Sequence, residues 1–187
     1  FDVRALVAEW QDLIGGYVDK VYQRDDEIVL RLHVPGRGKA ELYSKSGRWL
    51  CLHEVEDKPE DPPPFAQTLR RLLDNARLVG VEQRGLDRIA TFHLERGAER
   101  YDLVWEVFQK GNVVLVREGV VVAVLLPQTF KDRTLRVGEP YAFPPLGVDP
   151  LELDRDAFRS AVRGAKGQVV RVLASVLNLG GQYAEEL

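Results

Sequence analysis

Apolar residues recur over residues 1–14 with the spacing of one face of a helix. The residues on that face are Val3, Leu6, Val7, Trp10, Leu13 and Ile14. Asp2 stands where its carboxylate can cap the helix N-terminus, and Gly15-Gly16 interrupts the pattern. We therefore predict an amphipathic helix over 1–14.

Runs rich in β-branched and aromatic residues predict two groups of strands. The first group comprises 17–23, 27–34, 39–44 and 48–55. Four prolines make 57–64 a stiff loop that cannot pair in a sheet, and a second helix is predicted over 65–75. The second group comprises 77–83, 88–95, 100–108, 112–117 and 120–125, with hairpin turns at Gly111-Asn112 and Glu118-Gly119. A helix followed by strands thus occurs twice.

Two short matches support an internal duplication of this order. Val21-Tyr22-Gln23-Arg24 aligns with Val81-Glu82-Gln83-Arg84, and Lys45-Ser46-Gly47 aligns with Lys110-Gly111. Both matches, and the two helices, are offset by about sixty residues. We therefore predict an α+β fold, an antiparallel β-sandwich of two pseudo-repeated helix-plus-strands halves flanked by helices.

Prolines mark a boundary after the second group of strands. Residues 140–150 contain four of them, and helical patterns resume at 155–163 and 168–177, with another helix opening at Gly181. The prediction is one domain over 1–147 and a small helical segment over 148–187.

Composition and charge mainly exclude some classes of protein. The formal net charge of the 187 residues is -3, which argues against wrapping duplex DNA by charge alone but leaves room for a local arginine contact. Cys51 is the single cysteine, so no internal disulfide can form. No leader opens the chain, and the longest apolar run, 120–126, is too short to cross a bilayer. We expect a cytoplasmic protein without membrane contact and, since the chain starts at Phe1 and lacks methionine, a piece of a longer one.

The sequence offers little for catalysis. The soft metal ligands His33, His53, His93 and Cys51 do not have the spacing of a metal site within one segment, and the pair Cys51 and His53 alone is a weak pattern. There is no G-x-S-x-G elbow, and Gly36-Arg37-Gly38 is explained by a turn between strands. We predict no enzyme, no metal and no cofactor.

Two places are candidates for binding. Asp87-Arg88 falls at a predicted hairpin tip, where the aspartate could hold the guanidinium ready for bidentate contact with a phosphate or a base edge. A solvated tip with an ion pair of little energetic weight is the alternative. Gly180-Gly181 separates two helical patterns, so backbone N–H groups of the second helix could face a phosphate, as in helix-hairpin-helix modules. The alternative there is a plain turn closed by a C-cap glycine.

Several fragments occur in one order along nearly the whole chain. They are Phe1-Asp2-Val3-Arg4-Ala5-Leu6, Gly16-Tyr17-Val18-Asp19-Lys20-Val21-Tyr22-Gln23, Asn75-Ala76-Arg77-Leu78, Asp87-Arg88-Ile89, Phe108-Gln109-Lys110-Gly111-Asn112-Val113-Val114-Leu115, Gly138 to Tyr141 with Pro144-Pro145, and Leu177-Asn178-Leu179-Gly180-Gly181 with Tyr183-Ala184-Glu185-Glu186. The last fragment is the most specific. Together they resemble the NFACT family of ribosome-rescue factors, which includes bacterial RqcH, eukaryotic NEMF, and proteins also described as fibronectin-binding protein A-like.

The resemblance implies a layout and a function. The layout is an NFACT-N domain, similar in fold to the N-terminal domain of formamidopyrimidine-DNA glycosylases, followed by the start of a helix-hairpin-helix domain. In the family, an aspartate near the start and an Asp-Arg pair are needed to add C-terminal tails to stalled nascent chains, and they match Asp2, Asp87 and Arg88. The implied partners are tRNA, alanine tRNA in prokaryotic members, and the large ribosomal subunit carrying stalled peptidyl-tRNA. For Asp2 a helix cap remains an equally complete explanation.

Two other functions stay open on the resemblance. A DNA glycosylase-like protein would need an N-terminal proline amine followed by a glutamate for Schiff-base chemistry, and Phe1-Asp2 stands there instead. A fibronectin-binding adhesin would need export, and no export signal precedes the first helix.

Overall fold

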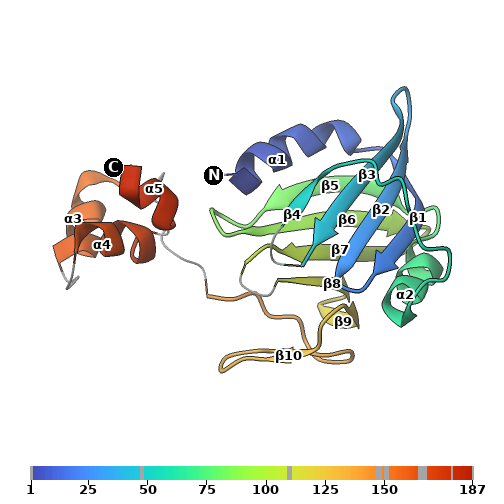
Figure 1. Ribbon diagram of the computed structural model, residues 1–187. Helices are drawn as coiled ribbons and strands as arrows, with labels where there is room; N and C mark the ends of the chain where they lie inside the picture. Colours follow the sequence, from blue (N-terminus) through green and yellow to red (C-terminus); the bar gives the residue numbers. More distant parts are fainter. Residues whose placement is uncertain are drawn as a thin grey trace. The chain divides into compact units, whose positions relative to one another are not determined.

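The computed structural model describes residues 2–46, 49–108, 111–145, 149, 152–163, 168–177 and 179–186 (Figure 1). Contacts divide the chain into two compact units, the first of residues 1–84 and 88–144 and the second of residues 85–87 and 145–187. The predicted domain boundary at 147/148 lies outside the described residues, as do Phe1, Gly47, Gln109, Lys110 and Asn178 of the sequence matches.

The first unit is built on one antiparallel sheet of nine strands in the order β4-β3-β2-β1-β5-β6-β7-β8-β9 (Figure 1). The strands are β1 Tyr17–Arg24, β2 Glu27–Val34, β3 Gly38–Lys45, β4 Trp49–Leu52, β5 Arg77–Gln83, β6 Ile89–Arg96, β7 Glu99–Glu106, β8 Asn112–Arg117 and β9 Val120–Val124. All nine were predicted, most within two residues of their ends. Fold class α+β and antiparallel pairing are thus confirmed.

Side-chain alternation explains why these segments are strands. In β2, Ile28, Leu30 and Leu32 are at most 1% exposed and enter the core, whereas Arg31 and His33 point to the opposite face. The larger core cluster takes residues from strands of both predicted halves and from both helices of the unit, and a smaller cluster takes residues from β6 to β9 and includes Leu135.

Hydrogen bonds between β1 and β5 join the two halves into one continuous antiparallel sheet, where the sequence predicted an antiparallel β-sandwich of the two halves. Tyr17 pairs with Arg77, Leu78 N–H donates to Gly16 C=O at 2.8 Å, and Val18 N–H donates to Ala76 C=O at 2.9 Å. Gly16 permits this close approach, because a Cβ there would lie 2.9 Å from a backbone oxygen.

The two halves share one irregularity at equivalent places. The β1–β2 register shifts between Val18 and Lys20, and the β5–β6 register shifts between Leu78 and Gly80, sixty residues later. Each shift is a bulge that turns the strand close to the β1–β5 junction.

The first helix of the unit packs on strands of the other half, and the second helix packs on strands of both halves. Helix α1 (Asp2–Trp10), extended by the 3-10 turn η1 (Gln11–Leu13), contacts β5 and β6, and the Trp10 and Phe92 rings are 5.5 Å apart. Helix α2 (Pro64–Leu73) contacts β1 and β9. It ends two residues before its predicted limit because Asn75 adopts a φ of 56°, which a helix cannot contain.

The segment after β9 contains a pairing that the sequence pattern did not predict. Strands β10 (Gln128–Thr129) and β11 (Thr134–Leu135) form a two-stranded ribbon, too short to show an alternating pattern. Arg133, beside β11, reaches back to the buried carboxylate of Glu106 at the end of β7.

The second unit is helical, as predicted. Its helices are α3 Arg155–Arg163, α4 Val169–Ser175 and α5 Gly181–Glu186. The Asp154 carboxylate caps α3 by accepting the backbone N–H of Asp156 and of Ala157, at 3.0 and 2.7 Å. In the part of the chain that is described, no helix is long and apolar enough to cross a membrane.

Candidate nucleic-acid interface

The predicted Asp87-Arg88 site lies in the turn that joins β5 to β6. Arg84 N–H donates to Ile89 C=O at 3.3 Å, and Val107 N–H donates to Arg88 C=O at 2.7 Å. The backbone of Arg88 is therefore held on the β7 side while its side chain is exposed, and Asp87 is half-buried. Arg88 is exposed and Asp87 is partly exposed, which agrees with the prediction from sequence, but the Oδ2 atom of Asp87 is buried.

A second arginine anchors the start of this hairpin. Arg84 Nη1 donates to Pro144 C=O at 2.7 Å, and its guanidinium carbon lies 4.4 Å from the Phe143 ring centroid. This cation–π contact and hydrogen bond connect β5 to the proline-rich segment of the first unit. The hairpin is thus fixed at its base.

Arg88 is held by its backbone, through the hydrogen bond from Val107 N–H, and its side chain is exposed. The Oδ2 atom of Asp87 is buried, so the two side chains differ in their access to solvent.

Asp2 begins α1, and two hydrogen bonds show how α1 runs along β5. Gly15 N–H donates to Leu78 C=O at 2.8 Å, and Gln11 Nε2 donates to Val81 C=O at 2.9 Å. Followed back from Gly15 to Asp2, the chain therefore runs toward the C-terminal end of β5. Nine helical residues rise about 13.5 Å and four strand residues about 13.4 Å, so we expect Asp2 near the level at which β5 ends. Asp2 is thus at the same end of the first unit as the start of β6.

The predicted Gly180-Gly181 site lies between α4 and α5 in the second unit. Gly180 has a φ of +75°, as predicted for a glycine between two helices, and Ala184 N–H donates to its carbonyl oxygen at 3.1 Å. This geometry fits both a helix-hairpin-helix turn and a plain C-cap. The six-residue length of α5 gives its N-terminus little dipole to offer an anion.

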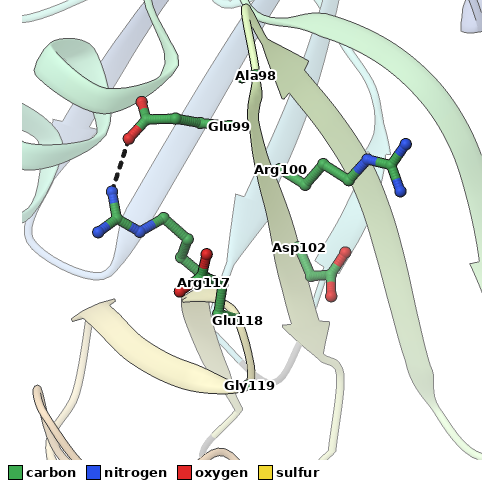
Figure 2. A pocket seen from close by; sticks show the side chains of 7 residues that line it. All are labelled: Ala98, Glu99, Arg100, Asp102, Arg117, Glu118 and Gly119. Atoms are coloured by element: carbon green, nitrogen blue, oxygen red, sulfur yellow. Dashed lines mark hydrogen bonds and ion pairs between the residues drawn. The ribbon is translucent and has the colours of Figure 1, made fainter.

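A pocket of about 510 Å³ opens in the first unit beside the β6–β7 and β8–β9 turns (Figure 2). Its lining residues are Ala98, Glu99, Arg100, Asp102, Arg117, Glu118 and Gly119. Two of its charges are already paired, since Arg117 Nη1 lies 2.7 Å from Glu99 Oε1 (Figure 2). Glu99 also accepts the Tyr101 hydroxyl at 2.8 Å. The pocket is lined mainly by charged residues, three acidic and two basic.

The described histidines and the cysteine do not assemble into a metal centre. His93 Nδ1 lies 2.7 Å from Asp102 Oδ1 and its Nε2 lies 3.4 Å from Glu82 Oε1, both on exposed strand faces. Burial raises the pKa of the Cys51 thiol, which disfavours the thiolate that a metal would need. Within the described ranges, no group of three His, Cys, Asp or Glu side chains could hold a metal ion.

Sequence reasoning missed a cluster of cations around Tyr22 on β1. Lys20, Arg31, Lys58 and Arg70 come from two strands, a loop and a helix, and each lies within 5.8 Å of the Tyr22 ring centroid. Lys20 and Tyr22 alternate with core residues of β1, so the sequence could have placed these two side chains on one face. The other three cations are distant in the sequence, so no local pattern connects them with Tyr22.

The chain is similar to proteins that are named as ribosome quality-control factors. A family model described as the NFACT N-terminal and middle domains matches residues 1–187. The archaeal Rqc2 homolog aRqcH of Methanocaldococcus jannaschii is 36% identical over 200 residues, covering 100% of this chain and 30% of that protein. The ribosome quality control complex subunit NEMF of Homo sapiens is 36% identical over 128 residues, covering 67% of this chain and 12% of that protein. The chain thus spans less than a third of the length of these relatives.

Solved structures share the fold. The N-terminal domain of fibronectin-binding protein PavA from Streptococcus pneumoniae matches with a TM-score of 0.84 at 22% identity, covering 100% of this chain and 76% of that one. The N-terminal part of the fibronectin/fibrinogen-binding protein from Streptococcus suis matches with a TM-score of 0.83 at 22% identity, covering 98% and 76%. At this identity the likeness speaks to fold alone. The family model, which spans the whole chain, and the archaeal relative show that the chain belongs to the NFACT family.

Proposed function

We propose that this chain is the N-terminal part of a ribosome-associated quality-control factor that acts in the cytoplasm as a non-enzymatic adaptor. It binds tRNA, and within the whole protein it binds the large ribosomal subunit that carries a stalled peptidyl-tRNA. It thereby supports C-terminal tailing of the nascent chain, of the alanine type, while the ribosome itself forms the peptide bonds. The observation that carries the proposal is the family match over the whole chain, with relatives named as ribosome quality-control proteins.

The tRNA contact is assigned to Arg88, Asp87 and Asp2. The Arg88 side chain is exposed and its backbone is held beside β7, and its guanidinium presents five donors in a fork that matches phosphate or a base edge. Asp87 would accept hydrogen bonds from a base or a ribose hydroxyl. Asp2, at the same end of the first unit as the start of β6, would add a second carboxylate acceptor.

The size of the effect separates this role from a structural one. An exposed charged pair contributes at most about 1 kcal/mol to stability. Loss of a charge-assisted contact to RNA is larger, on the order of 1–3 kcal/mol, or roughly ten- to a hundredfold in affinity. Asp87→Ala with Arg88→Ala should therefore remove tRNA binding and leave the fold intact.

Sequencing the RNA that copurifies with the full-length protein tests the proposal. We expect tRNA with the wild type and its loss in the Asp87→Ala/Arg88→Ala variant. A charge-neutral control is Asp132→Ala/Arg136→Ala, because both of these side chains are also exposed in the first unit. Equal tRNA recovery from all three proteins contradicts the assignment.

Gly180-Gly181 is proposed as a weaker RNA contact through the backbone of the second unit. Its geometry is that of a helix-hairpin-helix turn, but the short α5 limits what its N-terminus contributes. Gly181→Ala, which meets open space, would leave such a contact intact, whereas Gly180→Ala would strain the turn.

The internal duplication and the likeness to the N-terminal domain of formamidopyrimidine-DNA glycosylases belong with these proposals. The equivalent bulges and the Tyr17–Arg77 pairing support a pseudo-twofold between the halves. A glycosylase-like activity would be revealed by borohydride trapping of the full-length protein on damaged DNA, and we expect no trapped product.

A further inference from the structure

The outer face of the first half concentrates positive charge on one aromatic ring. Four of the six cation–ring contacts of the described residues converge on Tyr22, at 5.3 Å for Lys20, 5.3 Å for Arg31, 5.5 Å for Arg70 and 5.8 Å for Lys58. The ring is only 7% exposed, so these cations cover it. We call Lys20, Tyr22, Arg31, Lys58 and Arg70 the Tyr22 cluster.

Only part of this charge is neutralised within the fold. Arg31 Nε lies 2.6 Å from Asp19 Oδ2, and Lys58 Nζ lies 2.9 Å from Glu41 Oε1. In the described part of the chain, no ion pair includes Lys20 or Arg70. The cluster therefore has four cations for two carboxylates, in a chain whose formal net charge is -3.

Arg70 is positioned by neutral groups, which preserves its charge. Its Nε donates to Val21 C=O at 2.6 Å, and its Nη1 donates to Glu60 C=O at 3.5 Å. The positive charges gathered around the Tyr22 ring repel one another. Salt screens this repulsion only in part, because the separations are comparable to the Debye length of about 8 Å at physiological salt. Cation–π contacts worth about 0.5–2 kcal/mol each hold the cations beside the ring when no ligand is bound. An anion bound on this face would relieve the repulsion between them.

The strand register extends the basic and aromatic character along the same face. Arg31 and His33 are two apart on β2, so they share a face, and His33 pairs with Tyr17 on one side and Lys39 on the other. These three side chains are all exposed and form a row about 7 Å from the row of Arg31. The first row contains Lys20 and Arg31 beside Glu41, and the second contains Lys39 beside Tyr17 and His33. Cations with neighbouring aromatic rings suit a polymer that carries negative charges and flat bases.

We propose that the Tyr22 cluster binds the phosphodiester backbone of RNA, as a contact separate from Asp87-Arg88. The inference rests on the proposed function in that the polyanion is taken to be RNA. The Tyr22 cluster then contributes a part of the affinity for RNA that depends on salt and not on the base sequence. The reason is that phosphate contacts position a nucleic acid without reading its bases.

The test is titration of this chain with fluorescein-labelled single-stranded RNA and with a tRNA transcript, by fluorescence anisotropy over a series of salt concentrations. Lys20→Gln is the main variant, since Lys20 has no ion pair in the described structure whose loss could harm the fold. We expect the slope of log Kd against log salt to fall by about 0.7–0.9 for this one lost contact. The double variant Lys20→Gln/Lys58→Gln should lose about twice that slope and roughly tenfold or more in affinity.

The matched control is Lys131→Gln/Arg136→Gln, which removes the same charge from exposed positions of the first unit. We expect its slope to stay near that of the wild type. Lys58→Gln leaves the Glu41 carboxylate, 6% exposed, without its lysine. Thermal melts therefore accompany the titrations. If the double variant does not fold, the salt slope of Lys20→Gln is the result that tests the inference.

The inference is overturned if Lys20→Gln matches the control, if the wild-type chain binds no RNA at low salt, or if poly-glutamate displaces RNA equally well at equal charge. The last result would indicate an acidic peptide as the ligand. Failure of the proposed function looks different: full-length protein would tail normally without Asp87 and Arg88 while Lys20→Gln still lowered the salt slope.

Discussion

Arg133 is expected to be the most important single charge for the stability of the first unit. Its guanidinium forms a bidentate pair with Glu106, with Nη1–Oε1 at 2.5 Å and Nη2–Oε2 at 2.8 Å. Side-chain exposure is 6% for Arg133 and 1% for Glu106. Arg133→Ala would leave a buried carboxylate with the Tyr141 hydroxyl, 3.0 Å away, as its remaining partner. Breaking a buried pair in this way costs about 3–5 kcal/mol.

Thermal unfolding followed by tryptophan fluorescence measures this loss. The three tryptophans of the chain, Trp10, Trp49 and Trp105, all lie in the first unit, so their emission reports that unit. For a protein of this size, 1 kcal/mol shifts Tm by about 2–4 °C, which predicts a decrease of roughly 6–20 °C.

Two further variants make the reasoning refutable. Arg100→Ala removes an arginine that is 85% exposed and paired with Glu95, and it should cost at most about 1 kcal/mol. Replacing both partners, Glu106→Leu with Arg133→Leu, should restore most of the lost stability, because no charge is left buried. The account is wrong if Arg133→Ala melts like Arg100→Ala, or if the double variant is less stable than Arg133→Ala.

The remaining predictions concern Tyr141 and the C-terminal turn. Burial, reinforced by the Glu106 carboxylate, raises the pKa of Tyr141 above its usual value near 10. The stability that its neutral hydroxyl provides is therefore complete below about pH 10 and is lost at higher pH, so Tyr141→Phe should flatten the alkaline decline of Tm. Parallel declines would contradict this. Gly180→Ala should lower helix content in the second unit, at a cost of about 1–2 kcal/mol for its positive φ, while Gly181→Ala should not. Circular dichroism checks this, and equal effects of the two changes would count against it.

Much of the sheet could be predicted because local pattern decides it. The β2 segment alternates between core and solvent, and Glu118-Gly119 has the positive φ angles of a tight hairpin, as its composition indicated. The exposed β5–β6 turn with Asp87 and Arg88 followed from the same logic. The strand ends were set by turn chemistry that is visible in the sequence.

The features that were missed depend on long-range partners. The β10–β11 ribbon is held near Glu106, a residue that lies more than twenty positions earlier in the chain. The joining of β1 to β5 depends on a close backbone approach at Gly16 that no hydrophobic pattern records. The Tyr22 cluster gathers cations from four separate elements, so neither local charge nor net charge revealed it.

Tail synthesis by the full-length protein carrying Asp87→Ala and Arg88→Ala tests the central claim most directly. The assay is immunoblotting of a stalled reporter chain in cells that depend on this protein, beside Asp132→Ala/Arg136→Ala as the charge-neutral control. Tryptophan-detected melts of the chain should differ from wild type by no more than a few degrees, since an exposed charge such as that of Arg88 contributes at most about 1 kcal/mol and Asp87 is only half-buried. The account predicts that tails disappear in the Asp87→Ala/Arg88→Ala variant and persist in the control. Normal tails in that variant would contradict the account.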